Sequence, residues 1–160
     1  MRQIGLVLAT VALVSSGLFA TVASASAPPA KPFLAEVTED FSPSCTPGAT
    51  CGTAFVTPYG PATVISEITV FDWLPSSFCF HDEHTSTLTF RDGSTLVLAV
   101  VGTLCPTFFH SNFMFSGSFS VLPELSTRRF SEATCSGLVS AFRDNGPIHA
   151  EFAGTISRSH

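Results

Sequence analysis

Residues 78–106 constrain the fold of this chain more than any other stretch, because they carry a clear β-hairpin pattern. Residues 85–90 alternate Thr with Ser, Leu and Phe, and residues 95–101 are β-branched and apolar. The two segments flank Asp92-Gly93, and alternation on both sides of an Asp-Gly pair is a strong hairpin signal. The sequence therefore predicts two antiparallel strands joined at this turn.

The turn chemistry also predicts the register of the hairpin. Residues 91–93 suit a three-residue loop whose glycine adopts the left-handed conformation of a G1 bulge. Leu88 then faces Leu96, and Cys79 lies directly opposite Cys105. Opposed strand residues have Cα atoms about 4.5–5.5 Å apart, a separation that a disulfide can span, so we expect a Cys79–Cys105 disulfide. A two-residue turn is the rival register, and it would shift this opposition by one residue.

Three further cysteines are interpreted from their surroundings. Cys45 and Cys51 flank Thr-Pro-Gly-Ala-Thr, a composition typical of turns, so we expect a local disulfide that closes a small loop. Cys135 is then unpaired, and the simplest interpretation is a small buried hydrophobic side chain. An intermolecular disulfide or a reactive thiol are the alternatives.

Residues 1–25 have the layout of a secretory signal peptide. Arg2 supplies a positive start, residues 4–14 are apolar, and small residues lead to a cleavage site after Ala25, or at the latest after Ala27. The apolar run is shorter than the ~20 residues that a membrane-spanning helix needs. We therefore expect a secreted, extracellular protein that has no membrane association after cleavage.

Length and composition limit the remaining possibilities. A Pro-rich lead-in over residues 26–32 precedes a single domain over residues 33–160, which is long enough for a real core. Seven Lys and Arg stand against twelve Asp and Glu, a formal net charge of −5. Such a chain has no basic stripe for phosphates, so no nucleic-acid partner is expected. Sixteen Phe with few charges predict a large apolar interior.

The rest of the chain alternates polar and apolar residues in short segments separated by Gly and Pro turns. No stretch of ten or more residues has a convincing helical period. Short strands at this spacing predict an all-β fold, an antiparallel barrel of about eight strands, with a β-sandwich as the alternative. Low charge favours the barrel, because closure removes exposed strand edges. Besides the hairpin, the expected strands are 33–40, 52–57, 62–73, 112–121, 135–143 and 147–157.

Three stretches share motifs with a known family. TLTFRDGSTLVLAVVGTLCP is followed by FSGSFSVLPELSTRRFSEATCSGLVSA and finally by EFAGTIS. Together they resemble small secreted bacterial barrels related to the calycin-like allene oxide cyclase and dirigent-type barrel, over residues 52–157. Arg128 and Cys135 stand where that family pattern usually has glycines. The resemblance implies an eight-stranded antiparallel barrel with a central cavity and a homotrimer, and it matches no functional residue of the family to a position here.

The densest cluster of titratable side chains is the run from His81 to His84. In a strand, His81 and Glu83 lie on one face, whereas Asp82 and His84 lie on the apolar face that includes Leu88. If that face is the barrel interior, Asp82 and His84 lie at the mouth of an apolar cavity, a layout typical of ligand sites. A solvated strand end is the plainer alternative. Two pairs on opposite faces do not give three converging ligands, so no metal site is expected.

Three functions are compatible with these features. The leading hypothesis is a secreted, non-enzymatic barrel that binds a small apolar molecule and uses no cofactor, since no G-x-S-x-G, H-E-x-x-H, paired C-x-x-C or phosphate-binding loop is present. The second is a cofactor-free isomerase or cyclase for a hydrophobic substrate, suggested by the family resemblance alone. The third is a disulfide-stabilised interaction protein that acts through its outer face. A cavity with one polar mouth favours the first two, and a filled interior with an exposed apolar patch favours the third.

Overall fold

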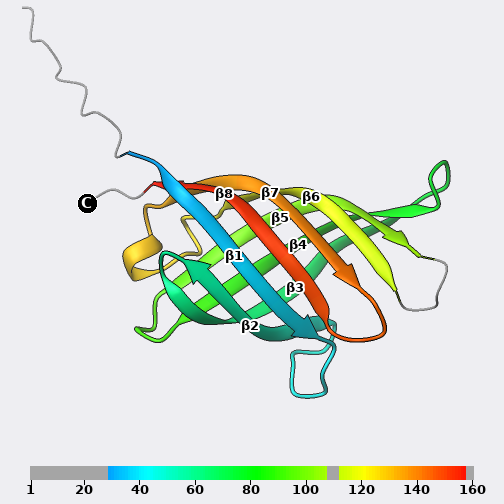
Figure 1. The fold of residues 1–160 in the computed structure, drawn as a ribbon, viewed down its shortest axis with the longest axis horizontal. Helices are drawn as coiled ribbons and strands as arrows, with labels where there is room; N and C mark the ends of the chain where they lie inside the picture. Colours follow the sequence, from blue (N-terminus) through cyan, green and yellow to red (C-terminus); the bar gives the residue numbers. More distant parts are fainter. Residues whose placement is uncertain (1–28, 108–111, 158–160) are drawn as a thin grey trace, which may run out of the picture.

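The computed structural model describes residues 29–107 and 112–157, and in these ranges the chain is a closed antiparallel barrel of eight strands. Each strand pairs with the next along the chain, and β1 also pairs with β8 (Figure 1). The barrel prediction is confirmed and the sandwich alternative is wrong, whereas the predicted signal peptide lies outside the described residues. The strands are β1 (Lys31–Asp40), β2 (Ala49–Thr57), β3 (Gly60–Leu74), β4 (Cys79–Phe90), β5 (Thr95–Pro106), β6 (Phe113–Val121), β7 (Thr134–Arg143) and β8 (Ile148–Ser157).

Alternation along each strand separates an interior from an outer surface, as period-2 side-chain geometry requires. In β1, Phe33, Ala35 and Val37 are buried, while Glu36 is exposed. The strand begins two residues before the sequence pattern indicates, because Lys31 pairs with Ile156 of β8. Pairing with a neighbour thus extends the strand into the Pro-rich lead-in.

The β4–β5 hairpin has the register that the turn chemistry predicts. Leu88 pairs with Leu96, and Gly93 has a φ of 74° within the three-residue loop. The loop is closed by the Phe90 amide, which donates to the Ser94 carbonyl oxygen at 3.0 Å. Both predicted disulfides are present, Cys79–Cys105 with a Cα–Cα distance of 4.3 Å and Cys45–Cys51 with 5.8 Å.

The end of the barrel nearest the Gly93 turn is closed by a packed aromatic plug. The short 3-10 helix η1 (Arg128–Phe130) lies at this end of the barrel (Figure 1). Its Phe130 side chain is completely buried. The Phe130 ring lies 5.1 Å from the ring centroids of both Tyr59 and Phe90. Phe90 and Phe130 belong to the buried core, and Tyr59 packs against it.

Arg129 fixes the plug to the hairpin turn. Its guanidinium lies 4.6 Å from the centre of the Phe90 ring and 3.5 Å from Asp92 Oδ2. The Ser94 hydroxyl and amide both donate to Asp92 and, with Arg129 and Arg128 nearby, hold the pKa of that carboxyl below its usual value. The loop arginine is therefore a structural clamp.

Inward-facing glycines let β7 and β8 approach each other closely. Gly137 of β7 pairs with Gly154 of β8. A Cβ added at Gly137 would lie 2.1 Å from the Ala153 carbonyl oxygen and 2.6 Å from the Gly154 Cα atom, closer than real Cβ atoms approach. Glycine is therefore required at this position by the distance between two backbones.

We predict that Gly137→Ala lowers the free energy of unfolding by about 1–3 kcal/mol, since the added methyl group overpacks rigid backbone. Urea-induced unfolding, followed through the fluorescence of Trp73, the single tryptophan of the chain, measures this change. The matched control is Gly146→Ala, where the nearest atom is an ordinary 3.7 Å away and a change within about 0.5 kcal/mol is expected. Equal stability of the two variants would contradict the close approach of β7 and β8.

Candidate functional site

The barrel interior is hollow at the end opposite the aromatic plug. A cavity of about 90 Å³ lies there, among side chains that come from the plug-distal parts of all eight strands. Most of its walls are apolar, and Phe113, Phe115 and Phe152 supply aromatic surface. Three titratable side chains also line it, Glu39, Asp82 and His84. An apolar cavity with a few convergent polar groups is the usual layout of a ligand site.

Asp82 and His84 reach this cavity together, as the parity of β4 predicts. Asp82 is 3% exposed, and its Oδ1 atom lies 2.5 Å from Nδ1 of His84. The His84 ring packs 5.7 Å from the centroid of Phe115. The contact with Asp82 engages Nδ1 of the imidazole, so Nε2 is the ring nitrogen outside this pair. His81 and Glu83 form a separate pair on the other face of the strand, with Nε2 and Oε1 2.9 Å apart.

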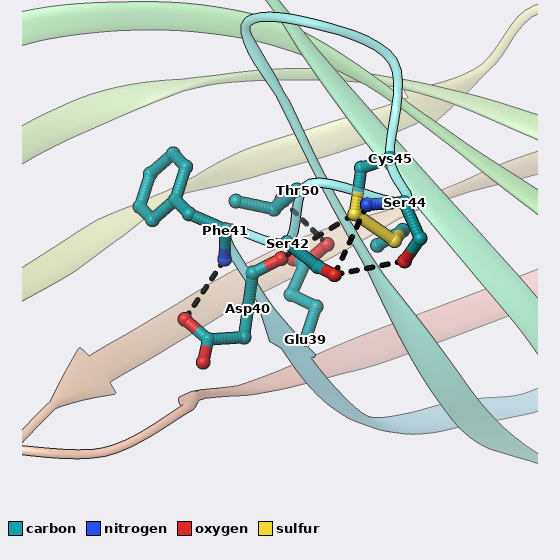
Figure 2. The surroundings of a disulfide bond; sticks show 8 residues. Glu39, Asp40, Phe41, Ser42, Ser44, Cys45 and Thr50 are labelled. Atoms are coloured by element: carbon teal, nitrogen blue, oxygen red, sulfur yellow. Dashed lines mark hydrogen bonds between the residues drawn. A yellow bond between two sulfur atoms is a disulfide. The ribbon is translucent and has the colours of Figure 1, made fainter.

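Glu39 is the cavity residue that the sequence interpretation missed. It is 8% exposed, and its Oε2 atom accepts a 2.8 Å hydrogen bond from the Thr50 hydroxyl, as Figure 2 shows. The Ser66 hydroxyl approaches Oε1 at 3.3 Å and lies 2.9 Å from the Ser86 hydroxyl. A signal was available, because the inward alternation of β1 that includes Val37 continues to Glu39.

The loop after β1 holds Glu39 at the mouth of the cavity. The Cys45–Cys51 disulfide closes this loop (Figure 2). Phe41 and Gly48, which also belong to the loop, line the cavity. Asp40 turns the chain by accepting a 2.8 Å hydrogen bond from the Phe41 amide. The disulfide thus braces the segment that forms one side of the rim.

A β-bulge in β3 places aromatic rings beyond the cavity. The register between β3 and β4 shifts between Ile68 and Val70, so that Phe71 pairs with Asp82 and Trp73 with Phe80. Without the extra residue, the opposite parity of β3 would face inward. Phe71 stacks on Phe80 with ring centroids 4.4 Å apart, and Trp73 lies 4.9 Å from the same ring. Both remain about half exposed, on a hairpin that extends past the barrel end (Figure 1).

The other candidate residues lie away from the cavity. Cys135 is a free thiol with 6% exposure that packs in the core, as the simplest interpretation predicts. Loss of hydration on burial raises the pKa of the Cys135 thiol to about 12. His149 is exposed on the outer face of β8 and stacks on Phe142, with ring centroids 5.3 Å apart.

Two further properties concern the described ranges, residues 29–107 and 112–157. Within them, no three or more His, Cys, Asp or Glu side chains are grouped so that they could hold a metal ion. No helix in the same ranges has the length and apolar character needed to span a bilayer.

Comparison with known proteins finds no match to this chain among protein-family models, curated proteins or solved structures. The resemblance to allene oxide cyclase and dirigent-type barrels therefore stays a prediction, and so does the trimer that it implies. The site must be interpreted from its own residues.

We predict that the Cys135 thiol resists alkylation in the folded protein, because it is buried and stays protonated far above neutral pH. Iodoacetamide at pH 8 should add one carbamidomethyl group per chain only after unfolding in guanidinium without reductant, as measured by intact-protein mass spectrometry. Equal labelling rates in native and denaturing buffer would show that Cys135 is accessible in the native state.

Proposed function

We propose that this protein is a secreted, non-enzymatic barrel that binds a small, mainly apolar molecule at its open end. The observation that carries the proposal is the cavity of about 90 Å³, which has mostly apolar walls and is also lined by Glu39, Asp82 and His84. Drug-sized ligands occupy pockets of about 300–1,000 Å³. The inserted group is therefore small, no larger than a short alkyl chain with its polar head.

The rim supports the same proposal. Phe71 and Trp73 are half exposed and lie three and five residues beyond Ile68, which lines the cavity. Exposed aromatic rings next to an apolar cavity provide a surface along which an apolar molecule can approach. The exposed patch that would favour an interaction protein is thus continuous with the pocket and serves ligand entry.

Two observations support export. Residues 1–25 have the layout of a signal peptide, and the structure contains two disulfides. Disulfides persist in oxidising compartments and are rare in the cytosol.

We predict that Ala150→Leu abolishes binding of a small probe, because Ala150 lines the cavity and a larger side chain fills it. The measurement is a titration of isotope-labelled protein with 1-butanol, in which amide NMR shifts of wild type should change at Asp82, His84 and Phe115. Ala153→Leu is the matched control, since Ala153 is exposed on the outer face of the same strand. Shifts that survive in Ala150→Leu, or none in wild type, would refute binding in this cavity.

A second candidate function is favoured by the Asp82–His84 contact. A histidine oriented by a carboxylate can act as a general base, and this one lines an apolar cavity. A cofactor-free isomerase would use the free Nε2 atom to move a proton on a bound hydrophobic substrate.

If the barrel is an isomerase, His84→Gln should slow proton abstraction by about 10²-fold or more. Exchange of the α-hydrogens of 2-butanone in deuterated water, followed by NMR, measures that step without knowledge of the substrate. His149→Gln, on the outer face of β8, is the control. Identical exchange rates in wild type, both variants and buffer would exclude this chemistry for a short ketone and leave the non-enzymatic proposal.

A further inference from the structure

The cavity contains the buried carboxyl group of Glu39, and no cationic side chain in the part of the chain that the structure describes is in contact with it. The Glu39 carboxylate is 8% exposed and is contacted by neutral hydroxyl groups from Thr50 and Ser66. Among the described residues that line the cavity, none is Lys or Arg. The hydroxyl donors satisfy the oxygen atoms of Glu39 but carry no charge, and burial of a carboxylate charge without a counter-charge is costly.

The hydroxyl groups beside Glu39 have a fixed order of donation. The Ser66 hydroxyl has one hydrogen, so when it donates to Glu39 Oε1 it must accept from the Ser86 hydroxyl 2.9 Å away. Ser66 and Ser86 are both buried. The Ser86 hydroxyl therefore donates to Ser66, and the Ser66 hydroxyl donates to Glu39. The Glu39 carboxylate is the final acceptor of this chain of hydrogen bonds.

The other charged groups near Glu39 have partners of their own. Asp82 Oδ1 lies 2.5 Å from Nδ1 of His84. Arg143 lies at the same end of the barrel, but its guanidinium contacts the Asp40 carboxylate at 3.4 Å and the Gly146 carbonyl oxygen at 2.9 Å. Glu39 is therefore the acid of the cavity whose hydrogen-bond partners are hydroxyl groups.

The apolar walls favour the same kind of ligand. Four phenylalanine rings line the cavity, and the faces of aromatic rings attract cations most strongly where water is excluded. The volume of about 90 Å³ is below that of an engineered ~150 Å³ cavity that binds benzene. A compact head group with a short aliphatic chain fits these limits. The four rings are Phe41, Phe113, Phe115 and Phe152.

We propose that the ligand of this cavity is a small organic cation, a primary alkylammonium ion whose head group binds the Glu39 carboxylate. This inference rests on the proposed binding function and specifies the class of ligand. The ammonium group donates hydrogen bonds to the Glu39 carboxylate and places a positive charge beside it. The alkyl chain lies against the phenylalanine rings.

The test uses three probes of equal chain length that differ only in the head group: n-butylammonium, 1-butanol and butyrate. Their dissociation constants for the full protein are measured by NMR titration at pH 7 and constant ionic strength. n-Butylammonium should bind at least ~10-fold more tightly than 1-butanol, because a hydrogen bond to a charged group is worth more than a neutral one. Butyrate should bind most weakly, since its charge repels Glu39.

Glu39→Gln should remove the preference, so that n-butylammonium and 1-butanol bind equally. Glu36→Gln removes the same charge from the exposed face of the same strand and should leave the preference intact, which excludes a general effect of net charge. Equal affinity of the three probes for wild type overturns the inference and leaves the binding function standing. If no probe binds wild type, both the binding function and the preference for an ammonium group are overturned. The comparison of the three probes is made on wild type, so it does not depend on the folding of a variant.

Discussion

Pairing of β1 with β8 is the interaction on which the rest of the structure depends. It joins residues more than a hundred positions apart, from Lys31 with Ile156 to Glu39 with Ile148, and it closes the sheet into a barrel. Closure also determines what the alternation of every strand does, because one face of each strand lines the barrel interior and the other forms the outer surface. Filled and hollow regions, buried acids and exposed rings are all consequences of that enclosure.

The two ends of the interior differ because their side chains differ in size and polarity. At the plug, Phe90, Phe130 and Tyr59 meet and fill the cross-section. At the open end, hydroxyl and carboxyl groups take the corresponding inward positions, and smaller residues leave space. A polar group next to apolar walls interacts more strongly with a partner than it would in water. The same strand geometry thus yields a packed aromatic core at one end and a cavity with polar groups in its wall at the other.

Local chemistry made the hairpin predictable. An Asp-Gly turn admits few loop geometries, so the register, the Cys79–Cys105 opposition and the shared face of Asp82 and His84 follow from the sequence. The sequence left open whether this face is the barrel interior, and the structure places both side chains in the cavity. The β-bulge near Thr69 could not be predicted from the sequence, because the order of polar and apolar residues in β3 does not mark the register shift against β4. Its effect is to turn Phe71 and Trp73 toward Phe80. Glu39 was missed for a different reason: a charged residue at a strand end is usually solvated, whereas this one is buried and bonded to Thr50 of β2 and Ser66 of β3.

Both disulfides lie at the open end of the barrel. Cys45–Cys51 closes the loop that follows Glu39, and Cys79–Cys105 ties the start of β4 to the end of β5, beside the aromatic rim. The plugged end is held by packing and by the Arg129 clamp, neither of which depends on oxidation. The covalent constraints of this barrel therefore lie at the end that holds the cavity, and the shape of the cavity mouth is linked to the redox state of the compartment in which the chain folds.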